Sequence, residues 1–424
     1  MDTSEGLRII STAKALEGFQ RGDEKLSRYL GATILAGHVG LFLSSLRRHQ
    51  SMKLSKFRAL ASAAHIDWPM LNTQIIPWMV KQGFIELGGS GDVRTVMCNV
   101  VDYQAILRGT AELFNSLDPT PEELAVLGLL DLGIQMPRTK TEVFKNGALG
   151  KDAVVERAVG LASAYRIVRV LEGEGIAEPV VYSPLIWGDN MAKAAKALSH
   201  MDTTKREQLL HLIERVQQYQ GLPRHSAERW ANKVGAPELV DQAVCLGLLD
   251  NTVIASSTGE KHFLTTPHLY GEIAVAHGRD VCDRIRLFLD SIRHGQHYGD
   301  WYTGRISDPV VLLNRLINRG QIGPCTAIGR DYQLVERAGV INVKPSLWKS
   351  GQFVMELAQE DTVMMVRDIV AQEPVAADMA PPSGSGTCDQ DDFRSAEETR
   401  AQLGEPPQRV REAEMEMLRN LREM

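Results

Sequence analysis

One stretch of the chain, residues 36–100, constrains the fold more than any other. Its apolar residues recur at helical spacing in three successive runs, and Gly83 ends the third run. Two short extended segments follow, separated by a turn rich in Gly and Asp, which is the pattern of a β-hairpin. The sequence therefore predicts helices over 36–48, 54–64 and 68–82, a basic loop between the first two, and strands over 84–87 and 94–100.

The end of this stretch recurs three times further along the chain. In each case a helical run is followed by a polar turn, a glycine and two apolar residues, at Gly83, Gly175, Gly247 and Gly339. These glycines lie 92, 72 and 92 residues apart. Glycine is favoured in the left-handed conformation just after a helix. The pattern predicts four similar units, the second being the least regular because Pro179 interrupts its hairpin.

These repeats predict a mainly α fold with small β-hairpins (α+β). The expected divisions, in chain order, are N-terminal helices (1–35), units one to four (36–117, 118–202, 203–279 and 280–373), a disordered acidic linker (374–406) and an amphipathic C-terminal helix (407–424). The Pro, Gly and Ser content of the linker indicates disorder. The C-terminal helix is expected to dock on a protein partner through one apolar face, which contains Val410, Met417, Leu418 and Leu421.

The composition is that of an ordinary globular protein, with 44% hydrophobic and 24% charged residues. The N-terminus lacks the features of a secretory signal, and no apolar run approaches the ~18 residues that a membrane-spanning helix needs. The five cysteines are scattered without a C-x-x-C pair, which favours free thiols in a reducing compartment. We therefore expect a cytoplasmic protein with no membrane segment.

The sequence contains none of the common catalytic motifs. It lacks a P-loop, an H-E-x-x-H zinc motif, a G-x-S-x-G nucleophile and a dinucleotide-binding fingerprint. His294 and His297, with Asp300 nearby, have a spacing that metal ligands use, but no third and fourth ligand is evident. The aromatic residues of the same predicted loop, 294–302, either stack on nucleobases or fasten the loop to the core. We expect no catalysis, no cofactor and no bound metal.

The net charge of −6 is unevenly distributed along the chain. Unit one carries eight basic and five acidic residues, a net charge of +3, whereas unit three balances eight against eight. Because nucleic acid is bound chiefly through its phosphates, unit one is the expected contact. Unit two offers Arg157, Arg166 and Arg169 along one predicted helix, but glutamates lie among them. The third helix of unit three contains Glu238 and Asp241 and no basic residue, which favours a protein partner.

Residues 51–100 resemble the winged helix-turn-helix superfamily, in the broad style of prokaryotic transcription regulators. The resemblance implies DNA binding or macromolecular assembly and no chemistry. In such a unit the start of the second helix lies over the phosphate backbone, the third helix faces a groove, and the hairpin reaches the adjacent groove. The DNA-binding residues that it implies are Arg47, Arg48, Lys53, Lys56, Arg58, Asn72, Thr73, Gln74, Lys81 and Arg94 in unit one, and Arg330, Lys344 and Lys349 in unit four.

Three functions stay open on the sequence. The first is non-enzymatic binding of double-stranded DNA through unit one, in a regulatory protein or a DNA-associated complex. The second is a scaffold subunit of a multiprotein assembly, in which the C-terminal helix docks on a partner. The third is RNA binding through the loop 294–302. The polar residues of the third helix of unit one are also typical of a plain solvated surface, and Pro77 predicts a kinked or short helix there.

Overall fold

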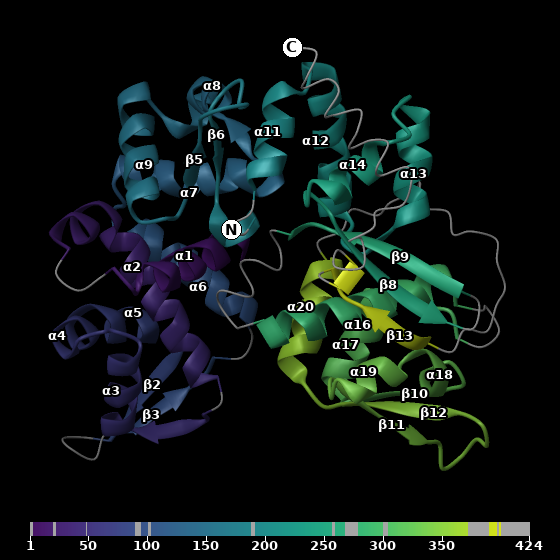
Figure 1. Ribbon diagram of the computed structural model, residues 1–424. Coiled ribbons are helices and arrows are strands. Elements are labelled where there is room, and N and C mark those ends of the chain that lie inside the picture. Colours follow the sequence, from purple (N-terminus) through teal and green to yellow (C-terminus); the bar gives the residue numbers. More distant parts are fainter. Residues whose placement is uncertain are drawn as a thin grey trace. The chain divides into compact units, whose positions relative to one another are not determined.

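The protein consists of two compact bodies, both visible in the computed structural model (Figure 1). The N-terminal body comprises Met1–Glu172 and Pro179–Gly188, and the C-terminal body comprises Gly173–Glu178 and Asp189–Met424. Both are mainly helical with small antiparallel sheets, which confirms the expected α+β class. The structure describes residues 3–19, 23–47, 49–89, 95–100, 103–187, 191–256, 259–267, 279–299, 304–371, 390–396 and 398–399.

Unit one has the order helix, strand, two helices, strand, strand. Its elements are α2 (Glu24–Leu46), β1 (Ser51–Lys53), α3 (Leu54–Ala63), a third helix made of α4 (Trp68–Met70), a π-helical turn (Leu71–Ile75) and α5 (Ile76–Lys81), then β2 (Ile85–Gly88) and β3 (Thr95–Cys98). In the sheet, Val96 of β3 lies opposite Met52 on one side and Leu87 on the other. The expected basic loop before α3 is therefore wrong. Its last residues form β1 because Met52 is buried on the inner face of the sheet.

The third helix of unit one continues through Pro77. Proline has no N–H and its ring crowds the carbonyl of the residue four positions earlier. The π-helical turn Leu71–Ile75 lies directly before the proline and accommodates this, so that the helix extends to Lys81. Gly83 follows in the left-handed region, with a φ of +74°, as the sequence predicted.

Helix α2 of unit one packs closely against two further helices, α1 (Thr3–Leu16) and α6 (Tyr103–Ser116). Glycines allow the close approach. A methyl group added at Gly37 would lie 2.9 Å from the carbonyl oxygen of Ile9, and one at Gly40 would lie 2.6 Å from the Thr110 hydroxyl. The expected boundary after residue 35 falls inside α2, because the apolar residues on both sides of it belong to one buried helix.

Helix α2 bends at Leu30, whose φ of −134° and ψ of 21° are not helical. Backbone groups beside the bend are bonded by side chains at the start of α7 (Pro121–Gln135). The Thr33 N–H donates to Glu123 Oε1 at 3.0 Å, and the Thr120 hydroxyl donates to the Tyr29 carbonyl at 3.4 Å. Thr120 and Glu123 also form the predicted capping box of α7. The side chains of Thr120 and Glu123 thus cap α7 and also form hydrogen bonds with backbone groups of α2 beside its bend.

Helix α2 also has a membrane-like composition. Among the described residues it is the one helix long and apolar enough to cross a membrane by length and composition, contrary to the expectation from the sequence. In this structure, 56% of its most apolar window is buried inside the protein. Contacts with α1 and α6 account for much of this packing, which is that of a central core helix.

Unit two repeats the element order of unit one. Its elements are α7, β4 (Arg138–Thr139), α8 (Lys140–Lys145), a 3-10 turn (Gly147–Leu149), α9 (Asp152–Ala164), β5 (Arg169–Leu171) and β6 (Val180–Tyr182), followed by α10 (Pro184–Trp187). The expected long helix is wrong, because α9 ends at Ala164 and Arg169 begins a strand. Arg166 lies between them with a left-handed φ of +58°. Arg157, Arg166 and Arg169 therefore do not share a helix face.

The turn after the third helix has the same hydrogen bonds in all four units. A left-handed residue donates its N–H to the carbonyl three positions earlier, and the next residue donates to the carbonyl five positions earlier. The left-handed residues are Gly83, Arg166, Gly247 and Gly339, spaced 83, 81 and 92 residues apart. The repeat of this turn is therefore observed. In unit two its residue is Arg166 and not Gly175, which lies between β5 and β6.

Unit three gains an extra strand from the C-terminal segment. After α11 (Ala192–His200), its elements are α12 (Thr203–Gln218), β7 (Leu222–Pro223), α13 (Arg224–Lys233), α14 (Leu239–Cys245), β8 (Asp250–Ser256) and β9 (Gly259–Thr265). Strand β13 (Gln390–Arg394) pairs with β8 and places Phe393 opposite Ile254. The expected disordered linker is thus wrong at these residues. Residues 372–389 and 400–424, including the predicted C-terminal helix, lie outside the described residues.

Unit four begins later than the sequence predicted. Its elements are α17 (Pro309–Arg319), β10 (Gln321–Cys325), α18 (Ile328–Asp331), α19 (Gln333–Arg337), β11 (Ile341–Pro345) and β12 (Phe353–Leu357), followed by α20 (Glu360–Ala371). The preceding helix α16 (Arg279–His297) is an additional element, and it includes His294 and His297, which the sequence had placed in a loop. In all four sheets the third strand of the unit lies between the first two.

Candidate nucleic-acid interface

The start of α3 carries two exposed lysines. Lys53 is the last residue of β1 and the N-cap of α3, and Lys56 lies in the first turn of this helix. The residue after Lys56, Phe57, is turned inward and buried, with its ring centroid 4.9 Å from that of Phe42 on α2. This packing fixes the rotation of α3 and directs Lys56 to solvent. Within the described residues, neither lysine forms an ion pair.

The remaining predicted arginines of this region differ in their surroundings. Arg58 is exposed, and its guanidinium carbon lies 4.8 Å from the centroid of the Trp68 ring. This cation–π contact holds Arg58 beside the first turn of the third helix. Arg47 is half-buried at the end of α2. Arg48 and Arg94 lie outside the described residues.

The third helix of unit one has the two faces that the sequence predicted. Leu71, Ile75 and Met79 are buried, whereas a polar set is exposed that consists of Asn72, Thr73, Gln74 and Lys81. The Thr73 hydroxyl donates to the Pro69 carbonyl at 2.8 Å and is therefore engaged by its own helix. In the described part of the chain, the Asn72 and Gln74 side chains have no hydrogen-bond partner, so both amides can bind a ligand.

Carboxylates are scarce around these residues. No acidic residue occurs between 36 and 66, and Asp67 is the first one. The Asp67 carboxylate accepts the Met70 N–H at 2.8 Å and caps the third helix. Glu86, on β2, accepts a hydrogen bond from the Asn99 amide at 3.0 Å. These two carboxylates are thus engaged by hydrogen bonds within unit one, and Lys56 and Arg58 give α3 a basic surface.

Unit four presents a smaller basic set. Arg330, Lys344 and Lys349 are all exposed, but Lys344 forms an ion pair with Glu356 at 2.7 Å. Lys349 lies in the loop between β11 and β12. The residue before it, Trp348, is largely exposed and was not selected from the sequence. A large apolar side chain between turn-forming serines is the signal that would have identified it.

Unit three does not offer a comparable basic surface. The acidic residues Glu238 and Asp241, expected from the sequence, are both half-buried, and Asp241 is paired with Arg224. Arg224 also contacts Glu228 at 2.7 Å. On the sheet, Arg394 of the C-terminal strand β13 is paired with Glu260. Several of the basic side chains of this region are therefore neutralised by neighbouring carboxylates.

Helix α16 carries a row of buried polar side chains that the sequence analysis missed. The Arg286 guanidinium lies 2.9 Å from the Asp250 carboxylate, and Asp290 accepts the Thr252 hydroxyl hydrogen bond at 2.6 Å. The Arg293 guanidinium carbon lies 3.8 Å from the centroid of the Tyr219 ring. These residues fasten α16 to unit three, so the row is structural and does not face a ligand.

Burial changes the protonation of this row. Burial raises the pKa of Asp290 to about 7 and lowers the pKa of His294 to about 4, in the second case with help from Lys261. Burial, with Arg293 as a second cause, lowers the pKa of His297 to about 3. Because His294 is 0% and His297 5% exposed, neither can stack on a nucleobase. Of the aromatic residues expected to contact RNA, Tyr298 is half-buried and its hydroxyl lies 3.0 Å from His225 Nδ1. RNA binding through residues 294–302 stays a prediction. Trp301 and Tyr302 lie outside the described residues.

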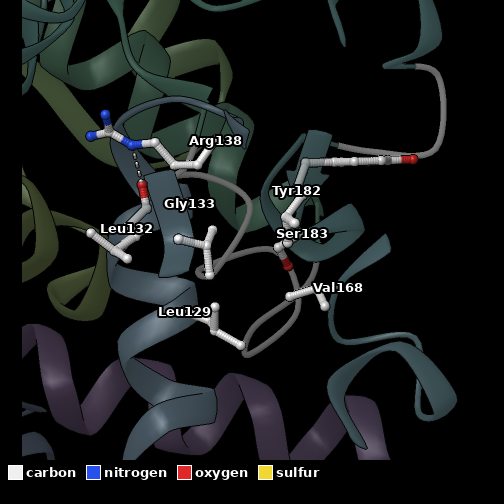
Figure 2. A pocket seen from close by; sticks show the side chains of 9 residues that line it. Leu129, Leu132, Gly133, Arg138, Val168, Tyr182 and Ser183 are labelled. Carbon is white, nitrogen blue, oxygen red and sulfur yellow. Dashed lines mark hydrogen bonds between the residues drawn. The ribbon is translucent and has the colours of Figure 1, made fainter. Parts of the chain in front are cut away.

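The structure also bears on small ligands. Among the described residues, no group of three or more His, Cys, Asp or Glu side chains is placed to hold a metal ion. Figure 2 shows a pocket of unit two, where the Arg138 Nε donates to the Leu132 carbonyl at 3.3 Å. The space open to the centre of a water molecule there is about 10 Å³, close to the minimum for one water. This pocket is too small for a substrate or cofactor. Its lining residues are Leu129, Leu132, Gly133, Arg138, Val143, Val168, Val181, Tyr182 and Ser183.

No family model, no curated protein sequence and no solved structure matches this chain.

Proposed function

We propose that this protein is cytoplasmic, consists of four tandem winged-helix units, and binds double-stranded DNA through the first of them without catalysing a reaction. Two features of the fold support the proposal. Each unit has the order helix, strand, helix, helix, strand, strand, and each sheet has the third strand in the middle. A helix pair followed by such a hairpin is the arrangement of a winged helix-turn-helix unit.

The observation that carries the proposal is the exposed face of unit one. Lys53, Lys56 and Arg58 lie on or next to α3, and the sequence contains no acidic residue from 36 to 66. Cations at the start of the second helix are placed to neutralise phosphates. Asn72 and Gln74 project from the third helix, and their amides match the hydrogen-bonding edge of adenine. Phosphate contacts by α3 and base contacts by the third helix form one interface.

Charge reversal tests this proposal. The double variant Lys53→Glu with Lys56→Glu should bind a random duplex at least about tenfold more weakly, because two phosphate contacts become repulsive. The matched control is Lys205→Glu with Lys233→Glu, which makes the same charge change at two exposed lysines of unit three. Fluorescence anisotropy with a labelled duplex measures both. Equal losses in the two variants would show that only net charge matters and would contradict a specific face on unit one.

A second function is favoured by one observation in unit three. Its sheet accepts an additional strand, β13, at the edge formed by β8. Addition of a peptide strand to a sheet edge is a common mode of protein recognition. In this alternative the units form a scaffold, and the predicted C-terminal helix docks on a partner through the residues Val410, Met417, Leu418 and Leu421.

Truncation separates the two functions. Under the scaffold alternative, deletion of residues 405–424 should remove partner proteins from a pulldown while the duplex affinity of the purified protein stays unchanged. A pulldown that is identical with and without these residues would contradict the alternative.

A further inference from the structure

Two adjacent side chains at the tip of the unit-four hairpin are far more exposed than any other large apolar side chain in the described part of the chain. Leu347 is 92% exposed and Trp348 is 88% exposed, whereas the next value is 50%, at Leu124. A tryptophan in water forgoes the burial of the largest apolar surface that any side chain offers. Such a residue is typical of a binding site.

The loop that carries these residues is well ordered by its own hydrogen bonds. The Ser346 N–H donates to the Gln352 carbonyl at 2.8 Å, which closes the loop. The Ser346 hydroxyl oxygen accepts the N–H groups of Trp348 and Lys349, each at 3.3 Å. Gly351 supplies a left-handed residue, with a φ of +72°. The tryptophan is therefore presented on a preorganised turn, and little conformational entropy is lost when it binds.

The tip carries a positive charge of its own. Between Glu336 and Glu356 the chain contains three basic residues and no acidic one; Lys344 is paired with Glu356, whereas Arg337 and Lys349 are exposed. The exposed Lys349 directly follows Trp348. Arg330 lies near the base of the loop, because the preceding Gly329 packs on the ring of Phe353. An aromatic ring among cations suits a ligand that is both anionic and aromatic.

We propose that the unit-four hairpin binds unpaired nucleotides next to a duplex, with the Trp348 ring stacking on a base. Bases inside a duplex are already stacked on both sides, so the ring has a free partner only at a single-stranded segment or a duplex end. Lys349 contacts the phosphates of the same segment. The inference rests on the proposed function and extends it: unit one holds the duplex, and unit four adds a preference for single-strand junctions.

Other partners fit the tip less well. Two apolar side chains are too few to hold a protein on a membrane, since a full acyl chain alone gives only marginal binding. A protein partner would need an acidic rim to match the basic loop and an apolar pocket for Trp348. Nucleic acid supplies both the charge and the aromatic surface.

The test compares three fluorescently labelled probes by anisotropy: a blunt duplex, the same duplex with a single-stranded overhang, and an oligothymidine. The wild-type protein should bind the overhang duplex about tenfold more tightly than the blunt one. Trp348→Ala should remove this preference and weaken blunt-duplex binding far less than overhang binding, because only the terminal base pairs of a blunt duplex have a free face. Trp348→Phe should keep most of the preference because it keeps a ring. Val311→Ala, at another exposed apolar residue of unit four, serves as the control.

The possible outcomes separate this inference from the function it extends. Equal wild-type affinity for the two duplexes, or an equal loss on both in Trp348→Ala, overturns the inference alone. If the wild type binds no blunt duplex at low salt, the proposed function fails, and the oligothymidine probe then tests the inference by itself. Oligothymidine binding that is lost in Trp348→Ala supports the inference. Absence of oligothymidine binding by the wild type overturns it. Trp348-dependent binding to phosphatidylserine vesicles without an effect on nucleic acid overturns it in favour of a membrane.

Discussion

Replacement of the buried His294 by leucine should make the region around α16 less sensitive to acid. The ring of His294 is 0% exposed, and neither ring nitrogen has a hydrogen-bond partner among the described residues. Leucine has a similar size and needs no partner, so His294→Leu should be neutral or stabilising at pH 7, by up to about 2 kcal/mol.

The magnitude at lower pH follows from the lowered pKa. In the folded protein the pKa of His294 is about 4, against the ordinary 6.5. Because the folded pKa is depressed, the neutral ring stabilises the fold fully above 6.5, and this contribution is lost as the pH falls towards 4. At pH 5 the loss for one histidine is about 2 kcal/mol, from 1.5 pH units at 1.36 kcal/mol each. The His294→Leu variant has no titrating group at this position, so it shows no such loss of stability at pH 5.

Hydrogen–deuterium exchange of peptides from α16, corrected for intrinsic rates, measures the opening free energy at both pH values. The opening free energy of His294→Leu relative to that of the wild type should rise by about 2 kcal/mol when the pH is lowered from 7 to 5. The control is Ile292→Val, a buried and non-titratable position on the same helix, which should cost about 1 kcal/mol at both pH values. A difference between His294→Leu and wild type that does not change with pH would refute the claim that burial keeps this ring neutral.

Three further substitutions test the N-terminal body by urea denaturation. Glu123→Ala should cost about 3 kcal/mol because it leaves a buried backbone amide of α2 without an acceptor, and Glu156→Ala, at an exposed glutamate, should change stability by less than about 0.5 kcal/mol. Gly37→Ala should cost about 2 kcal/mol through its clash with α1, whereas Gly31→Ala on the same helix, where a methyl group meets nothing within 4 Å, should be neutral or stabilising. Arg166→Gly should stabilise the protein by about 1 kcal/mol because arginine is strained at a φ of +58°. An unchanged free energy of unfolding would contradict the assignment of Arg166 to the left-handed turn of unit two.

Local backbone chemistry explains which parts of the fold could be predicted. The left-handed turns at Gly83, Gly247 and Gly339 follow from the conformational freedom of glycine, and the capping box of Thr120 and Glu123 from its spacing. These signals act within a few residues and are readable in one sequence. In unit two the same turn was missed because an arginine replaces the glycine.

Elements that depend on distant partners could not be read from the sequence. Strand β1 is three residues long and exists because β3 pairs with it. Strand β13 lies in a polar, Pro-rich segment and forms on the edge of β8. The polar side of α16 has the sequence pattern of a solvated face, but Asp290 and Arg293 are buried against unit three. In each case tertiary contacts override the local signal.

The candidate interface of unit one was more predictable than that of unit four. Exposure of Lys56 and of the polar face of the third helix followed from helical periodicity alone, whereas Lys53 was expected in a loop and lies at the end of β1. The ion pair of Lys344 with Glu356 and the exposure of Trp348 depend on the register and shape of the β11–β12 hairpin. The serines around Leu347 and Trp348 indicate a turn with an apolar tip, but the ion pair of Lys344 depends on the strand register, which no single residue type encodes.

The most direct test of the central claim is the salt dependence of duplex binding by unit one. A plot of log affinity against log salt concentration falls with a slope of about −0.9 for each phosphate that the protein neutralises. We expect a steep slope for the wild type and a slope less negative by about two units for Lys53→Ala with Lys56→Ala. Binding with the same slope in both proteins, or no binding at low salt, would contradict duplex recognition by this face.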